Sequence, residues 1–215
     1  MPGLAVCRPA DANECAEAWR LAVDGERPTG LVLSRQELPV LSETAARAPR
    51  GVERGGYVLV DEPGAGTGPP DLVLMGTGSE VHVCVAAAER LAADGLRVRV
   101  VSLPCWEWFE EQDTSYRSSV LPPGVPKLAV EAGTSFGWDR YADATVSIDR
   151  FGASAPGPRV LAELGFTPEH VAERSLELLR ERRAGAGAAG PAAGARAADA
   201  GGHTEHAGGD EGGSR

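Results

Sequence analysis

The stretch LVLMGTGSEVHVCVAAAERLAADGLRVRVVSL, residues 72–103, places a helical pattern between two strand patterns. The residues LVLM are all apolar and predict a short buried strand. After the turn GTGSE, apolar residues recur at helical spacing as far as Ala92, and Gly95 predicts the end of that helix. RVRVVSL predicts the second strand. Because a strand, a helix and a strand of these lengths form a right-handed parallel unit, this stretch predicts an α/β domain.

The same alternation continues toward the C-terminus. KLAVEAG at 127–133 predicts a third strand, and TVSID at 145–149 predicts a fourth. Thr167 is a suitable N-cap and a proline follows it, which predicts a last helix that runs to about Arg182. We therefore predict that residues 71–183 form a small α/β domain with a mostly parallel sheet and flanking helices.

The N-terminal part carries a second, smaller pattern. Asp11 and Glu14 have the spacing of a capping box, and Gly25 predicts the end of the helix that they begin. A strand is predicted at Leu31–Leu33, and GGYVLVDE at 55–62 predicts another. The apolar face expected of the helix consists of Cys15, Ala18, Trp19 and Ala22.

Two segments are rich in glycine. PGAGTGPP at 63–70 predicts a linker. In residues 184–215, 21 of the 32 residues are Gly or Ala and none is large and apolar, which predicts a disordered tail. His203 and His206 lie three apart in this tail, but without a helix their spacing does not favour a metal site.

The composition limits the classes of function. The 215 residues include 21 Lys and Arg against 31 Asp and Glu, a net charge of -10, which argues against non-specific binding to nucleic acid or to an anionic membrane. No apolar run approaches the ~18 residues that span a bilayer, and the N-terminus lacks a signal pattern, so we predict a cytoplasmic protein. The four cysteines have no metal-ligand spacing and are expected to be buried thiols. They are Cys7, Cys15, Cys84 and Cys105.

Several patterns that could carry chemistry have a structural alternative. GTGSE at 76–80 sits where a phosphate-binding turn would sit, but it lacks the third glycine and the lysine of the known motifs. A tight turn with Ser79 as the helix cap explains it better. Glu131 ends a predicted parallel strand, where ligands bind, yet a contact with backbone donors between domains is the favoured interpretation. His82 and His170 have no acid or nucleophile at a useful spacing.

Two further stretches leave two interpretations open. Trp106, Trp108 and Phe109 lie close together and predict either a packing anchor or a partner surface. Arg35 follows an apolar run in LVLSRQELPVL, residues 31–41, and is either a solvated arginine or an anion site; the local pattern alone favours the first. No Ser-His-Asp set, paired carboxylates or metal cluster stands out, so we assign no catalytic and no metal-binding residue.

Ten short motifs follow one another along residues 6–180. They are RPADANE (8–14), LSRQELPVL (33–41), GGYVL (55–59), TGSEV (77–81), RVVSLPCWEWFEEQD (99–113), YRSSVLPPGV (116–125), VEAG (130–133), FGWDRY (136–141), IDRFGASAP (148–156) and GFTPEHVAER (165–174). Their content and order resemble the C-terminal section of transketolases, the end of the pyrimidine-binding domain followed by the C-terminal domain. Between Tyr141 and Asp149 the family has more glycine and a few more residues, which leaves the register of the fourth strand open.

The resemblance implies a division of the chain and a role for one arginine. Transketolases use thiamine diphosphate and Mg²⁺ to transfer a two-carbon ketol unit between sugar phosphates in the pentose phosphate pathway. The arginine of the family's S-R-Q stretch helps to bind the sugar phosphate, which implies a phosphate-binding site at Arg35 and Ser34. The implied parts are a remnant of the pyrimidine-binding domain (1–50), a connecting strand and linker (51–70), the C-terminal domain (71–183) and the tail (184–215).

The resemblance also implies what this chain would need in order to act. The family's cofactor-binding and catalytic residues lie upstream of RPADANE, so none is assigned here, and we expect neither turnover nor thiamine diphosphate binding by this chain alone. A strand at LVLSRQ without its neighbours would expose unpaired backbone groups. We expect a chain with the N-terminal transketolase domains, or a homodimer of such a complex, to complete it. The alternative is a truncated, non-catalytic fragment that serves as an interaction module.

Overall fold

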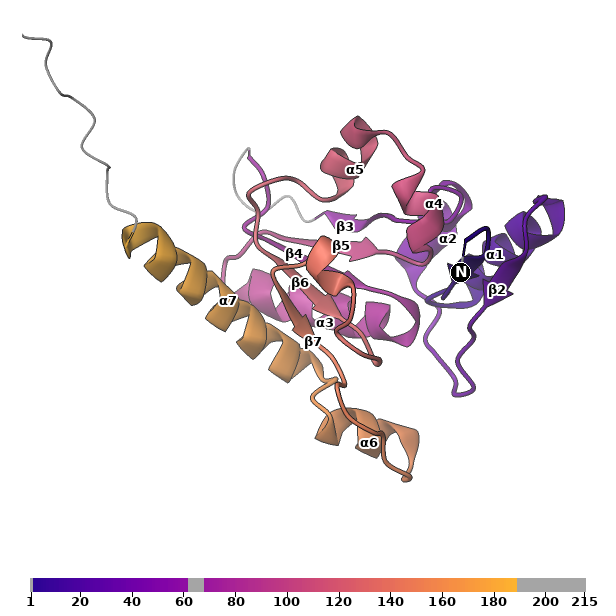
Figure 1. The fold of residues 1–215 in the computed structure, drawn as a ribbon. Helices are drawn as coiled ribbons and strands as arrows, with labels where there is room; N and C mark the ends of the chain where they lie inside the picture. The colour runs from indigo at the N-terminus through magenta and orange to yellow at the C-terminus, as the bar shows by residue number, and fades with distance from the viewer. Residues whose placement is uncertain (1, 62–67, 189–215) are drawn as a thin grey trace, which may run out of the picture.

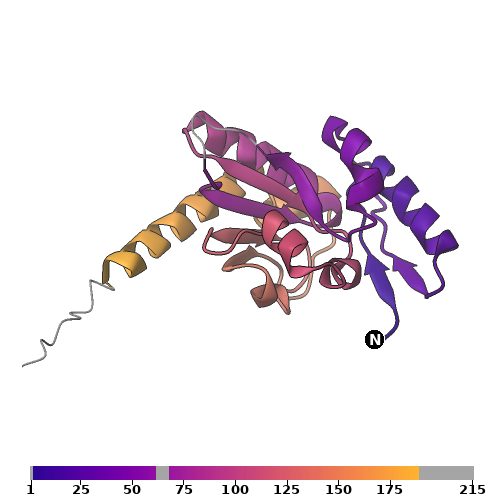
Figure 2. The ribbon, with the colours of Figure 1, turned by 90° about the horizontal axis from the view of Figure 1, so that it is seen from above.

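The computed structural model describes residues 2–61 and 68–188, which form a five-stranded sheet with helices on both faces and a smaller unit at one end (Figures 1 and 2). The elements are β1 (Ala5–Cys7), α1 (Ala12–Asp24), β2 (Thr29–Leu31), α2 (Ser42–Gly51), β3 (Tyr57–Asp61), β4 (Leu72–Gly76), η1 (Gly78–Glu80), α3 (Val81–Ala93), β5 (Val98–Ser102), α4 (Trp106–Glu110), α5 (Thr114–Val120), β6 (Lys127–Val130), η2 (Trp138–Arg140), β7 (Ala144–Val146), α6 (Gly157–Glu163) and α7 (Pro168–Ala188). We call β1, α1, β2 and α2 the N-terminal unit. None of the helices described is long and apolar enough to cross a membrane.

Strand β4 lies at the centre of the five-stranded sheet, whose order is β3-β5-β4-β6-β7. It pairs in parallel with β5 on one side and β6 on the other, so that Leu74 lies opposite both Val100 and Leu128. Strand β7 continues the parallel pairing beyond β6, whereas β3 pairs antiparallel with β5 at the other edge. The prediction of a mostly parallel α/β sheet is therefore confirmed. The linker predicted at 63–70 lies mostly outside the described residues.

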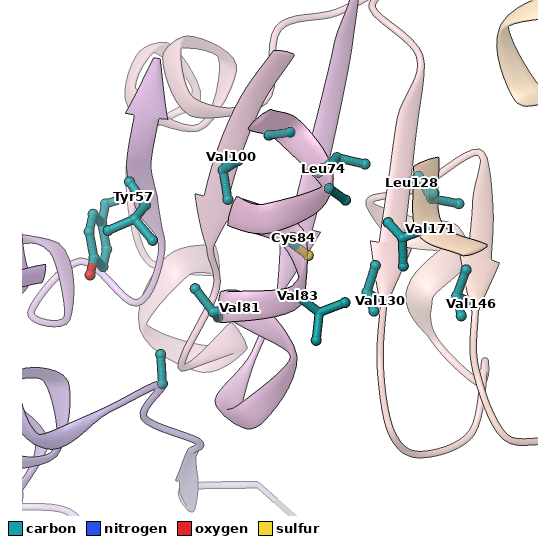
Figure 3. Packing of buried hydrophobic residues seen from close by; sticks show 14 of the residues in the cluster. Tyr57, Leu74, Val81, Val83, Cys84, Val100, Leu128, Val130, Val146 and Val171 are labelled. Atoms are coloured by element: carbon teal, nitrogen blue, oxygen red, sulfur yellow. The ribbon is translucent and has the colours of Figure 1, made fainter. Parts of the chain in front are cut away.

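The side chains of β4 alternate between two buried layers, and all five of its residues are buried. Leu72 and Leu74 belong to the layer formed with α3 and α7, whereas Val73 and Met75 belong to the opposite layer with Phe109 of α4. Because both faces of a parallel strand are covered by helices, its sequence is continuously apolar. Figure 3 shows the first layer, which includes Val81, Val83 and Cys84 of α3, Val171 of α7, and Val100, Leu128, Val130 and Val146 of the neighbouring strands.

The N-terminal unit is a short parallel sheet, β1 beside β2, with α1 packed on it and α2 packed on α1 (Figure 2). Helix α1 begins as predicted, because Asp11 Oδ1 accepts a hydrogen bond from the backbone N–H of Glu14 at 3.1 Å. It ends before Gly25, also as predicted. The Glu14 carboxylate accepts from the N–H of Ala10 at 2.7 Å, one residue ahead of the cap, so the capping box is shifted by one residue.

Two details of this unit differ from the predictions. Helix α1 turns Glu14 inward, so Trp19, which was expected on the apolar face, is 54% exposed. Strand β2 occupies Thr29–Leu31 instead of Leu31–Leu33. The reason is that its partner β1 ends at Cys7, where the chain leaves this sheet for the larger one. The backbone N–H of Val32 still donates to the carbonyl of Cys7 at 2.9 Å, but the ladder ends there.

The turn GTGSE is tight, as predicted, but its serine does not cap the helix. Gly78 has a φ of +61, a conformation that favours glycine. Helix α3 begins at Val81, after the 3₁₀ turn, and its first residues receive no side-chain cap. The Ser79 hydroxyl instead donates a hydrogen bond to the buried carboxylate of Glu80. This bond takes the place of the one that a capping serine makes with the helix backbone.

The last helix begins where the sequence predicts and ends later. The Thr167 hydroxyl accepts from the backbone N–H three residues on at 3.2 Å, which confirms the cap. Helix α7 then continues past Arg182 to Ala188, into the segment expected to be disordered. The extension contains three alanines, which favour a helix, and two glycines, which disfavour it, so helix propensity alone does not explain it. The rest of the predicted tail, with His203 and His206, lies outside the described residues.

The turn before β3 brings two backbones unusually close at Gly55. Gly55 has a φ of +75, and a Cβ at this position would lie 2.3 Å from the carbonyl oxygen of Cys105 and 2.3 Å from the backbone nitrogen of Phe109. Gly95, at the end of α3, also has a positive φ, +84, but no heavy atom lies within 4 Å of the position of its Cβ.

We expect Gly55→Ala to destabilise the protein much more than Gly95→Ala, measured as the free energy of unfolding in urea. Both substitutions force a positive φ on alanine, which costs about 1–2 kcal/mol. Gly55→Ala adds a clash with backbone atoms that cannot turn away, worth about 1–3 kcal/mol more. Equal losses for the two variants would show that the approach at Gly55 does not constrain the fold.

Candidate functional site

The N-terminal unit meets the five-stranded sheet at the carboxyl ends of β4 and β5. Immediately after β1, the backbone N–H of Arg8 donates to the carbonyl of Pro104, which follows β5, at 2.8 Å. The carbonyl of Arg8 accepts from the N–H of Gly78 at 3.0 Å and from the Thr77 hydroxyl at 3.3 Å, both in the turn after β4. The turn GTGSE therefore binds the backbone of the N-terminal unit at Arg8 and does not hold a phosphate with these groups.

The guanidinium of Arg8 lies between two carboxylates. Its Nη1 contacts Glu131, the residue after β6, and its Nη2 is 3.3 Å from Oε2 of Glu80. Both acids are buried, with 7% and 1% of the residue exposed. Burial raises the pKa of Glu80, and the Ser79 hydroxyl and the charge of Arg8 oppose that rise. Glu131 thus lies at a contact between the two parts, as predicted, but its partner is a guanidinium and not a set of backbone donors.

A second polar contact, centred on Glu14, joins the same two parts. The Glu14 side chain is fully buried, and its Oε1 accepts from the Tyr57 hydroxyl at 2.7 Å and from the Ser102 hydroxyl at 2.6 Å. Because Tyr57 belongs to β3 and Ser102 to β5, helix α1 is bonded to two strands of the larger sheet. Burial raises the pKa of Glu14, while the bonds from Ser102, Tyr57 and the N–H of Ala10 oppose the rise.

An open cleft of about 330 Å³ adjoins Arg8 at this junction. The rings of Trp106 and Trp138 meet edge to face in its wall, with centroids 4.8 Å apart, and Phe136 at its mouth is 86% exposed. Apolar walls with a few charged groups at the carboxyl ends of parallel strands are typical of small-molecule sites. The polar residues that line the cleft are Thr77, Glu107, Glu131 and Thr134, together with Arg8.

The aromatic stretch 106–109 is a packing anchor. Trp108 and Phe109 are buried, with 8% and 1% of the residue exposed. Trp106 is half-buried and its ring meets those of Trp138 and Tyr141 edge to face. Of the two interpretations left open by the sequence, packing is therefore the one that the structure shows.

The structure places Ser34 and Arg35 apart from this junction. Both are exposed on the loop between β2 and α2, and neither lines the cleft beside Arg8. Their role in phosphate binding stays a prediction. Burial lowers the pKa of His82, which is half-buried, and His170 is exposed.

The cysteines are free thiols, as expected from their spacing. Cys7, Cys84 and Cys105 are buried, whereas Cys15 is only half-buried. Burial is the largest cause of the raised pKa of Cys105, which reaches about 12.

The residues that dominate the junction were missed by sequence reasoning. Arg8 and Glu80 received no role, and Glu14 was assigned to a helix cap alone. Arg8 lies 123 residues from Glu131 and 72 from Glu80 along the chain, so no local pattern shows that they pair. The available signal was a single glutamate, Glu80, directly ahead of an apolar helix, because a buried carboxylate there requires a partner.

Family models match both parts of the chain. The model described as the transketolase-like TK C-terminal domain matches residues 55–167, and the transketolase pyrimidine-binding domain model matches residues 1–40. This chain belongs to the transketolase family. The resemblance inferred from the ten motifs is thereby confirmed.

Two relatives show how much of a transketolase this chain represents, and a third solved structure shares its fold. The transketolase of Geobacillus stearothermophilus is 52% identical over 184 residues, 83% of this chain and 27% of that protein. A structure of the Pichia stipitis transketolase in complex with sedoheptulose-7-phosphate is 38% identical with a TM-score of 0.76, and covers 85% of this chain and 26% of that one. This chain therefore spans about a quarter of the length of these two relatives. A split-gene transketolase, an inactive beta4 tetramer, shares the fold at 22% identity and a TM-score of 0.64, over 84% of this chain and 59% of that one.

We expect Glu14 to contribute a loss of stability in this transketolase chain as the pH rises above 4.5. Burial raises the pKa of Glu14 in the folded state above its ordinary value of 4.5. The folded state then binds the proton more tightly than the unfolded state, so the stabilisation is present below 4.5 and is lost as the pH rises through the raised pKa.

Urea unfolding of the wild type and Glu14→Gln, repeated across this pH range, checks the expectation. The variant cannot titrate at this position and should show a shallower fall than the wild type. The matched control is Glu26→Gln, an exposed glutamate in the turn after α1, which should keep the wild-type slope. Parallel profiles for the wild type and Glu14→Gln would contradict the assignment.

Proposed function

We propose that this chain supplies the C-terminal part of a cytoplasmic transketolase. In complex with a chain that carries the cofactor-binding domains, or in a homodimer of such a complex, it takes part in the transfer of a two-carbon ketol unit between sugar phosphates. Its functional division would be a pyrimidine-binding remnant at 1–50, a connection at 51–70 and a C-terminal domain at 71–183. The family matches and the span of about a quarter of its relatives support this proposal.

One face of the β1–β2 sheet is not covered by other elements that the structure describes, and this exposed face is the main support for a partner chain. Val6 lies opposite Gly30, and Val32 follows two residues later, so both valines lie on the same face. They are 37% and 51% exposed, whereas Ala5 and Cys7, on the other face, are fully buried. Because parallel sheets are stable when both faces are covered, this face is suited to a further layer from another chain.

The position of Arg35 supports a phosphate-binding role within that complex. Ser34 and Arg35 follow the carboxyl end of β2, which is the end of a parallel sheet where ligands bind. A guanidinium offers a fixed fork of donors that matches a phosphate, and a serine hydroxyl can add one more. The Pichia stipitis relative binds a sugar phosphate, sedoheptulose-7-phosphate, which fits this chemistry.

We assign thiamine diphosphate and Mg²⁺ to the partner domains, because the family resemblance implies that the cofactor-binding residues lie upstream of RPADANE. Within 2–61 and 68–188, no group of three His, Cys, Asp or Glu side chains is placed to hold a metal ion. The existence of a split-gene transketolase supports a division of the enzyme between chains.

The experiment that tests the proposal mixes this chain with a segment of the Geobacillus stearothermophilus transketolase that ends where the similarity begins. Ketol transfer by the mixture and not by either part supports it, and a mixture without association or activity contradicts it.

We expect this chain alone not to bind thiamine diphosphate. Isothermal titration calorimetry with Mg²⁺ present should show no saturable heat up to about 1 mM cofactor, a limit that corresponds to very weak binding. The mixture with the complementing segment is the positive control. Saturable binding by the isolated chain would place cofactor contacts on these residues.

We expect Arg35→Ala in the active mixture to lower kcat/KM roughly 10–100-fold for a phosphorylated ketose, because hydrogen bonds to charged groups contribute about 1.5–3 kcal/mol. The value for an unphosphorylated ketose should change little. Arg20→Ala, an exposed arginine on α1, is the matched control and should affect neither. Equal losses on both substrates would remove Arg35 from the phosphate site.

A further inference from the structure

The cleft beside Arg8 lies at the topological switch point of the sheet. From β4 the chain crosses through α3 to β5 on one side, whereas from β6 it continues to β7 on the other side. In open α/β sheets, ligands bind in the crevice outside the carboxyl ends of the strands at such a point. Here the crevice is bounded by Thr77 in the turn after β4 and by Glu131 after β6.

Arg8 lies at one side of this crevice and contacts the two carboxylates as a bound ligand would. It comes from the N-terminal unit, outside the sheet, and its backbone is held by the turn after β4 and by Pro104 after β5. Its guanidinium reaches Glu131 with one terminal nitrogen and Glu80 with the other. A planar fork with donors on both sides matches two separated carboxylates, which the single ammonium of a lysine would not do.

The two carboxylates form a buried acidic site that requires a cation. Glu80 and Glu131 have side chains only 2% and 9% exposed, and with Arg8 removed each would lose its cationic partner. Two buried carboxylates close together disfavour their charged forms unless a cation lies between them. Glu107 also lines the cleft, and its carboxylate accepts from the backbone N–H of Val6 at 3.1 Å.

The site is also accessible to a small solute. The Arg8 side chain is 27% exposed and borders the open cleft of about 330 Å³. Trp106 and Phe136 line this opening, and a guanidinium stacks well on aromatic faces. A solute that enters the cleft can therefore approach the two carboxylates along apolar walls.

We propose that the crevice at the carboxyl ends of β4 and β6 is a binding site for a guanidinium cation, with Arg8 as its resident occupant. Glu131 and Glu80 are the binding residues, and the aromatic cleft is the entry. The N-terminal unit is held to the sheet by occupancy of this site, and another alkylguanidinium can take the same place when the arginine side chain is absent. The proposal does not depend on complementation by a partner chain.

The test is chemical rescue of Arg8→Ala in the full chain, followed by thermal unfolding. We expect the variant to lower Tm by roughly 5–10 °C, because removal of one partner leaves buried charges without compensation. Ethylguanidinium chloride at about 20 mM should restore at least half of this loss by binding the folded state. The matched controls are ethylammonium chloride at the same concentration, which should restore much less, and Arg20→Ala, whose exposed arginine should leave Tm unchanged.

A double variant links the rescue to the site. In Arg8→Ala/Glu131→Gln one of the two carboxylates is neutral, and ethylguanidinium should no longer raise Tm above the effect of ethylammonium. Should Arg8→Ala fail to fold, the same comparison is made by refolding it with each salt, and recovery of the native circular dichroism spectrum only with ethylguanidinium supports the site. Equal effects of the two salts, retained rescue in the double variant, or no loss of Tm in Arg8→Ala would each overturn the proposal.

Discussion

The burial of strand β4 on both faces is the constraint on which the rest of this structure depends. Its side chains anchor two layers of helices, and its two edges are occupied by β5 and β6. The chain that leaves β4 turns sharply at Gly78, which has a positive φ. That turn presents Thr77 and Glu80 to the N-terminal unit, so the geometry of the core determines the geometry of the junction.

The junction itself is polar, which affects how it contributes to the fold. Two sets of contacts form the junction: Arg8 with its two acids, and Glu14 with Tyr57 and Ser102. Their hydrogen bonds and ion pairs roughly offset the cost of removing these groups from water, so their net contribution to stability is modest. Their orientation requirements are strict, because a shift of the N-terminal unit would leave a buried carboxylate without a donor. These contacts therefore specify where the unit sits more than how strongly it is held.

Much of the fold could be predicted because its signals are local. The apolar run of β4, the helical spacing of α3 and the caps at Asp11 and Thr167 each lie within a few residues. The junction could not be predicted in this way, since Arg8 meets partners 72 and 123 residues away and its own neighbours only indicate a strand end. Ser79 illustrates the same limit in reverse: its sequence position suits a cap, but a neighbouring buried carboxylate takes its hydroxyl. The assignment of Arg35 came from the family resemblance, because an exposed loop carries no sequence pattern that reveals its ligand.

The hydrophobic core crosses the line between the two family domains. Ala18 of α1 and Ala48 of α2 belong to the same buried cluster as Leu74 and Val81, and Arg47 of α2 donates to the carbonyls of Val58 and Leu59 in β3. The two segments should therefore unfold as one cooperative unit, although they descend from two domains. For the evolution of divided enzymes this means that a gene break between α2 and β3 would split one core between two polypeptides.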